Sequence, residues 1–171
     1  MKYLMFLFLM SFSVVVSAGE FVLQDDSNWY KAEDIDSFTE NKNVYFAIPA
    51  NEEAARLEKS AALFVRCLNN QTEMFINTGR DFFPFGGGDY VKIGIKIDDE
   101  KPYYEKFTKS SSSSAAFFQK PINFLKNLKG KSKIILRYQP YGENEKNATF
   151  EIKGINQVID EISETCKWPK K

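Results

Sequence analysis

The stretch Tyr90-Val91-Lys92-Ile93-Gly94-Ile95-Lys96-Ile97 is the strongest indication of the fold class. Its β-branched residues occupy every second position, and Lys92, Gly94 and Lys96 stand between them. A period of two is typical of a strand that buries one face and exposes the other. Such one-sided strands belong mostly to antiparallel sheets. The sequence therefore predicts an antiparallel sheet with one covered face.

Other segments extend this sheet and supply a cover for it. Pro121–Leu128 and Glu52–Lys59 are predicted as short helices. Residues 155–166 carry an apolar stripe at helical spacing and predict a C-terminal helix. We expect a single α+β domain over residues 19–171, in which this helix covers one face of the sheet. The further predicted strands are Val44–Ile48, Leu63–Leu68, Glu73–Asn77, Ile134–Tyr138 and Ala148–Ile152.

Residues 1–18 have the composition of a secretory signal peptide. Lys2 is followed by an apolar run from Tyr3 to Val16, and small residues precede a cleavage site after Ala18. This run is shorter than the ~20 residues that span a bilayer as a helix. We therefore expect a periplasmic or secreted protein, with no stable transmembrane segment after cleavage.

The expected location determines how the two cysteines, Cys67 and Cys166, are interpreted. In an oxidising compartment an even pair is more often a disulfide than a pair of thiols. Cys67 lies on the apolar face of its predicted strand, and Cys166 returns to the apolar stripe of the C-terminal helix eleven residues after Ile155. We expect a disulfide that ties this helix to the sheet. Two buried free thiols are the alternative.

The composition disfavours an enzyme. The chain has no histidine, which excludes Ser-His-Asp and Cys-His catalysis and histidine-ligated metal sites. The acids Asp25-Asp26 and Asp98-Asp99-Glu100 match neither a glycosidase pair nor a calcium loop, and they are typical of turns. We predict a non-catalytic protein with no cofactor and no metal site. A carboxylate-only enzyme acting on wall glycans is a minor alternative.

Charge is unevenly distributed along the chain. Residues 106–142 contain eight basic residues and no acidic one. Lys126, Lys129, Lys131 and Lys133 are therefore candidates for a basic face that binds an acidic protein or an anionic envelope surface. The alternative is that acids from other strands lie between these lysines. Nucleic acid is not expected as a partner, because the chain is exported and its pI is about 6.4.

An aromatic segment precedes the alternating strand. Phe82, Phe83 and Phe85 stand beside Pro84 and the glycines of residues 86–88. The three rings are candidates for an exposed tip that inserts into a partner. The alternative is that they pack over the end of the sheet, since phenylalanine is usually buried.

Several motifs follow one another along the chain: Trp29, Arg66-Cys67, Asn70-x-Thr72-Glu73, Leu136-Arg137-Tyr138-x-Pro140-Tyr141-Gly142 and Cys166-x-Trp168. In this order they resemble a known family, the VasI/TagO-like periplasmic proteins associated with type VI secretion. The resemblance covers about residues 27–168 and implies an exported, disulfide-bonded, non-catalytic accessory protein. For a protein of this kind we predict Trp29 as a candidate surface contact with the partner. Two positions depart from the pattern, because Lys96 replaces an expected arginine and Tyr103-Tyr104 an expected tryptophan.

These observations favour an accessory protein of the cell envelope that binds another protein of a type VI-like secretion apparatus. An exported inhibitor or immunity protein that neutralises a toxin or wall-acting enzyme is the alternative. The two differ in their partners, and the sequence names neither partner.

Overall fold

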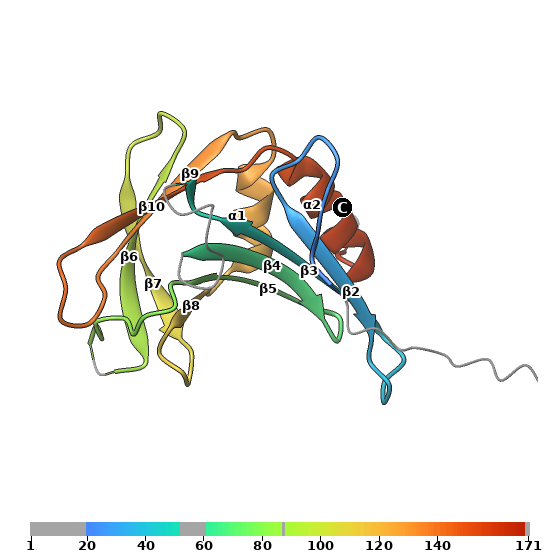
Figure 1. Ribbon diagram of the computed structural model, residues 1–171, viewed down its shortest axis with the longest axis horizontal. Helices are drawn as coiled ribbons and strands as arrows, with labels where there is room; N and C mark the ends of the chain where they lie inside the picture. The colour runs from blue at the N-terminus through green and yellow to red at the C-terminus, as the bar shows by residue number, and fades with distance from the viewer. Residues whose placement is uncertain (1–19, 52–60, 87, 170–171) are drawn as a thin grey trace, which may run out of the picture.

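The main element of the computed structural model is a ten-stranded, curled antiparallel sheet that forms a half-barrel (Figure 1). The structure describes residues 20–51, 61–86 and 88–169. The order across the sheet is β1-β2-β3-β4-β5-β8-β7-β6-β9-β10. The strands are β1 (Val22–Leu23), β2 (Tyr30–Ile35), β3 (Lys42–Pro49), β4 (Ala62–Leu68), β5 (Gln71–Asn77), β6 (Tyr90–Ile97), β7 (Tyr103–Lys109), β8 (Ala115–Phe118), β9 (Lys133–Tyr138) and β10 (Lys146–Glu151).

The curl of the sheet brings its two ends together. Asn28, just before β2, donates its backbone N–H to Lys153 O at 3.2 Å and its side-chain Nδ2 to Glu151 O at 2.7 Å. Gly154 follows with a φ of +90°, and a side chain there would collide with Ser27. Glycine satisfies both requirements because it lacks a Cβ.

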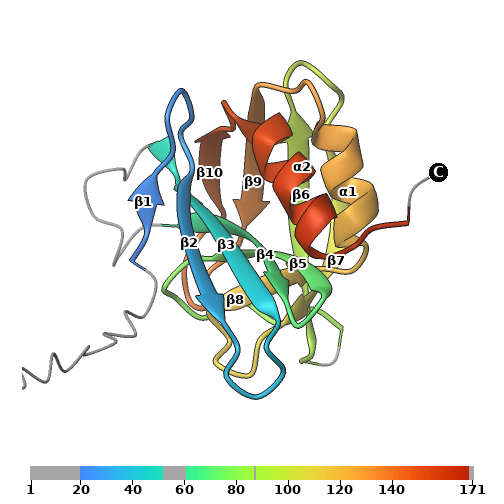
Figure 2. The same ribbon diagram turned by 90° about the vertical axis from the view of Figure 1, so that its right-hand side faces the viewer.

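Two helices cover one face of the sheet and lie side by side in Figure 2. They are α1 (Pro121–Leu128) and α2 (Ile155–Thr165). Proline at the first position of α1 suits the helix start, because the missing N–H has no intrahelical partner there. Both helices turn an apolar stripe inward, as the sequence pattern of residues 155–162 predicts. The side chains buried by α2 are Ile155, Val158, Ile159 and Ile162.

A disulfide fixes α2 to the sheet. It joins Cys67 of β4 to Cys166 at the C-cap of α2, with 5.6 Å between the Cα atoms. Beyond it, Trp168 Nε1 donates to Thr72 Oγ1 at 2.7 Å. The predicted pairing is therefore confirmed, and the alternative of two free thiols is wrong.

The antiparallel sheet and the C-terminal helix are confirmed. All six predicted strands are present, with ends shifted by a few residues, and α1 has the predicted bounds. Four strands were not predicted: β1, β2, β7 and β8. The predicted helix Glu52–Lys59 lies outside the described residues.

Candidate functional site

The predicted basic face is divided by acids from other elements. Lys129 lies 3.5 Å from Asp160 of α2, and Lys131 lies 2.5 Å from Glu100 in the β6–β7 turn. The bond to Glu100 raises the pKa of the Lys131 ammonium above its ordinary value. The alternative of interleaved acids is thus confirmed for these two lysines.

The side chains of the other two lysines of this set have no acid as a partner among the described residues, and their surroundings differ. Lys126 on α1 places its Nζ 5.6 Å from the centre of the Trp168 ring, in a cation–π contact. Lys133 begins β9 and is half-buried. The four lysines therefore have different surroundings, and two of them are paired with acids from other elements.

The predicted aromatic tip is also divided. Phe82 is only 2% exposed and packs edge-on against Tyr138 at 5.7 Å between ring centres, so it belongs to the core. Phe83 and Phe85 are 48% and 43% exposed, and Phe83 stacks on Tyr141. The prediction of an exposed tip is wrong for Phe82, because its ring fills the end of the core, and fits the other two.

Trp29 does not lie on the surface. Its side chain is fully buried at the start of the strand β2, within the main apolar cluster. The prediction that Trp29 is an exposed partner contact is wrong, because its indole ring is part of the apolar core.

The acids after β6 are structural. Asp98 adopts a φ of +45°, and its Oδ1 accepts hydrogen bonds from the N–H groups of Ser132 at 3.1 Å and Lys133 at 2.8 Å. This is the turn-forming role that was predicted. In the described part of the chain no group of three or more metal-ligating side chains is present.

The structure instead assembles basic and aromatic side chains on the sheet face opposite the helices. We call this the cationic surface, and it comprises Lys92, Lys96, Lys106, Arg137, Tyr90 and Tyr104 of β6, β7 and β9. Lys92 and Lys106 are directly paired across the strands, an arrangement of like charges that normally destabilises a sheet. Each ammonium lies over a tyrosine ring, Lys92 at 4.6 Å from Tyr104 and Lys106 at 4.5 Å from Tyr90. Cation–π contacts of ~0.5–1 kcal/mol at exposed sites offset part of this repulsion.

A hollow of about 300 Å³ lies within the cationic surface, over Gly94. Gly94 is paired with Tyr104 on one side and Arg137 on the other. A Cβ at Gly94 would lie 3.0 Å from the Tyr104 ring and 3.2 Å from Arg137 Cβ. The hollow therefore exists because this position has no side chain. Lys96, Ile135 and Asn147 complete its wall.

The charges of the cationic surface are not neutralised within the described residues, where none of its four cations forms an ion pair. Arg137 donates only its Nε, to Asn147 Oδ1 at 2.9 Å, which leaves its terminal NH₂ groups available. An adjoining hollow includes Phe83 and Phe85 beside Lys92 and Tyr104, with Glu145 as its one acid. The exposed phenylalanines thus border the cationic surface. Together they offer positive charge and aromatic rings to a ligand.

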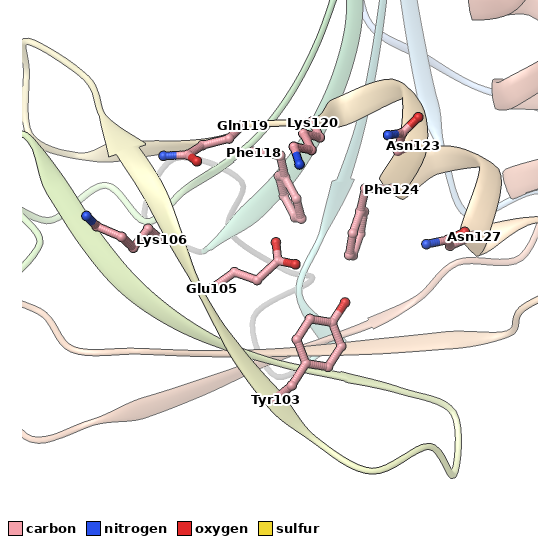
Figure 3. A pocket seen from close by; sticks show the side chains of 9 residues that line it. All are labelled: Tyr103, Glu105, Lys106, Phe118, Gln119, Lys120, Asn123, Phe124 and Asn127. Carbon is pink, nitrogen blue, oxygen red and sulfur yellow. The ribbon is translucent and has the colours of Figure 1, made fainter.

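A second hollow, of about 390 Å³, lies on the helix-covered side between β7 and α1 (Figure 3). Tyr103 and Glu105 project into it from β7, facing Phe118 and Phe124. Partial burial raises the pKa of the Tyr103 phenol, and the charges of Glu105 and Glu100 raise it further. The phenol therefore remains protonated at neutral pH and is able to donate a hydrogen bond.

Sequence reasoning found only part of this site. Lys106 and Arg137 were counted in the basic segment, whereas Lys92 and Lys96 lie outside it. The pattern of Tyr90–Ile97 could have revealed them, because the residues that alternate with its buried positions include Lys92 and Lys96 and therefore lie together on the exposed face of the strand. Lys96 and Tyr103-Tyr104, the two departures from the family pattern, lie in or beside the Gly94 hollow.

No family model and no curated protein matches the chain. Among solved structures it is similar to invasion associated protein B from Bartonella henselae, with a TM-score of 0.54 and 14% sequence identity. The match covers 84% of this chain and 97% of that protein. This likeness establishes the fold alone.

The disulfide bears on location. The Cys67–Cys166 disulfide is compatible with an extracytoplasmic protein. Within residues 20–51, 61–86 and 88–169, no helix has the length and apolar character needed to cross a membrane.

Proposed function

We propose that the chain is an exported, non-catalytic binding domain that recognises an acidic protein partner in the cell envelope through its cationic surface. The observation that carries this proposal is the convergence of four unneutralised cations on one face of the sheet, where Lys96 and Arg137 line the Gly94 hollow and Lys92 and Lys106 lie on the neighbouring strand pair. Nothing in the described fold requires this convergence, and the direct pairing of Lys92 with Lys106 opposes folding. An acidic ligand would relieve that repulsion.

The chemistry of the surface favours a protein over a small anion. Exposed aromatic rings and arginine are enriched at protein interfaces. Phe83 and Phe85 extend the contact area beyond the charged residues. The charges would steer an acidic partner and speed its association, in a manner that depends on ionic strength.

The proposals of export and of a partner in a secretion apparatus rest on the sequence. The signal peptide predicted in residues 1–18 supports export, and the resemblance to VasI/TagO-like proteins supports a partner in a type VI-like secretion apparatus. The inhibitor alternative would use the same surface against a toxin or wall-acting enzyme, and the identity of the captured partner separates the two.

A charge-reversal experiment tests the surface. We expect the double variant Lys92→Glu/Arg137→Glu to bind a fluorescein-labelled ten-residue glutamate peptide at least ~10-fold more weakly than the wild type, a loss of ~1.4 kcal/mol. The reason is that both cations line the proposed site. Fluorescence anisotropy at low and physiological salt measures the affinity, and the wild-type affinity should fall as salt rises.

Lys129→Glu/Lys131→Glu is the matched control, because it makes the same change in net charge away from the site. It should alter affinity by less than about twofold, since Lys129 and Lys131 lie outside the cationic surface and already face Asp160 and Glu100. Equal loss in both double variants would show that only net charge matters and would contradict the proposal. Tighter binding to phosphatidylglycerol vesicles than to the peptide would favour an anionic envelope surface instead.

Filling the hollow gives a separate prediction. Gly94→Val should weaken binding of the same peptide by about 5- to 10-fold, because the added side chain displaces the Tyr104 ring and Arg137. The melting temperature should change little, because both displaced side chains are exposed and a β-branched residue suits a strand better than glycine. Unchanged affinity in a variant that melts normally would remove the hollow from the binding site.

A further inference from the structure

Strand β7 lies in the interior of the sheet order, yet half of it is exposed. Its first four residues, Tyr103–Lys106, are all exposed, whereas an interior strand normally buries one face. The cause is the shortness of β8, which pairs only with Phe107–Lys109. From Tyr103 to Lys106 the edge of β7 that faces away from β6 has no partner strand in the described chain.

The direction of the backbone groups along this edge follows from one hydrogen bond. Lys109 N donates to Asp89 O at 2.8 Å, toward β6. Because backbone groups alternate in direction along a strand, those of Glu105 and Tyr103 also point toward β6. The N–H and C=O groups of Tyr104 and the N–H of Lys106 therefore point to the open edge, where they are available to an added strand.

The space beside this edge is the hollow between β7 and α1 (Figure 3). Helix α1 stands opposite β7 and contributes Asn123, Phe124 and Asn127 to the wall. Phe118, the last residue of β8, closes one end. A chain entering here would continue the line of β8, antiparallel to β7.

The two faces of β7 carry different kinds of side chain, and this determines which residues an added strand would place on each face. On the side of the helices, Tyr103, Phe118 and Phe124 present aromatic surface around the single carboxylate of Glu105, which disfavours an acidic side chain there. On the other side, Tyr104 and Lys106 belong to the cationic surface, beside Lys92. A strand added here would point alternate residues to these two sides. Apolar residues suit the first side, and acidic residues suit the second.

We propose that the open edge of β7 binds an extended segment of the acidic partner by strand addition, in which apolar and acidic residues alternate. This inference rests on the proposed function and names how the partner is bound. Main-chain hydrogen bonds to Tyr104 and Lys106 supply affinity, and the alternating side chains supply specificity.

Lys106→Pro is the decisive variant. Proline removes the outward N–H of residue 106 and leaves the bonds between β6 and β7 intact, and edges of sheets tolerate proline. The probe is an N-acetylated heptapeptide of alternating glutamate and isoleucine, compared with a peptide of the same composition in two blocks. We expect Lys106→Pro to bind the alternating peptide at least ~10-fold more weakly than Lys106→Ala, which keeps the N–H and loses the same charge.

Amide exchange provides a readout that does not depend on a variant's folding. Addition of the alternating peptide to the wild-type protein should slow exchange at Tyr104 and Lys106 and leave Lys129 unchanged. If exchange at Tyr104 and Lys106 is unaffected while Lys92→Glu/Arg137→Glu still abolishes binding, strand addition is wrong and the proposed function stands. If that double variant binds the peptide normally, the proposed function itself is contradicted, and the strand-addition proposal, which rests on it, is contradicted too. Binding of N-acetylglucosamine trimer in the hollow, without protection of these amides, would favour a saccharide site and overturn the proposal.

Discussion

Reduction of the Cys67–Cys166 disulfide is expected to lower the melting temperature by about 5–15 °C. The bond closes a loop with a sequence separation of 99 residues, and the chain-entropy model assigns ~4.7 kcal/mol to a loop of about that length. Losses of ~2–5 kcal/mol are typical, and each kcal/mol corresponds to roughly 2–4 °C in a domain of this size. Thermal unfolding followed by circular dichroism, with and without reductant, measures the shift.

The double variant Cys67→Ala/Cys166→Ala is the control for effects of the reductant itself. Its melting temperature should be low from the start and should not respond to reductant. A wild-type protein that melts at the same temperature after complete reduction, verified by thiol alkylation, would show that the bond contributes nothing to stability. The packing of α2 would then depend on its apolar stripe alone.

The parts of the fold that follow from the sequence are those with one clear period. Tyr90–Ile97 alternates without a break and coincides with β6. Pro121–Leu128 coincides with α1, because proline defines the start and the apolar residues recur at helical spacing. The pairing of Cys67 with Cys166 followed from the number of cysteines and from the faces on which they lie.

The missed strands lack such a period, for physical reasons that the structure explains. In β7 the first four residues are exposed, since β8 does not extend alongside them, so no alternation marks the strand. β2 ends in three exposed residues, Glu33, Asp34 and Ile35. The strand β8 has only four residues and follows the serine tract. Each of these strands is stabilised mainly by pairing with its neighbouring strands, and its own residues show no clear alternation.

The candidate site escaped prediction because its residues are separated along the chain. Lys92 and Lys96 come from β6, Lys106 from β7 and Arg137 from β9. A count of charges along the sequence joins Lys106 to Lys129 and Lys131, whereas the fold pairs Lys106 with Lys92 and pairs the other two with acids. Strand register decides which charges meet, and register was not determined by the sequence pattern.

Trp29→Ala is expected to destabilise the protein by about 3–5 kcal/mol, the cost typical of removing a large buried aromatic side chain. Trp29 is fully buried at the start of β2, close to where Asn28 joins that strand to the end of β10. Loss of the indole should therefore also weaken the closure between the two ends of the sheet. Denaturant unfolding gives the free energy, and amide exchange of β10 reports the closure.

Two variants separate this structural role from the surface role first predicted for Trp29. Trp29→Phe retains most of the ring volume and should cost less than half as much as Trp29→Ala. Phe83→Ala, at an exposed ring, should change stability by no more than about 0.5 kcal/mol while it weakens binding of the acidic peptide. A Trp29→Ala protein that is as stable as the wild type and impaired only in binding would support a surface position for Trp29 and contradict its burial in the core.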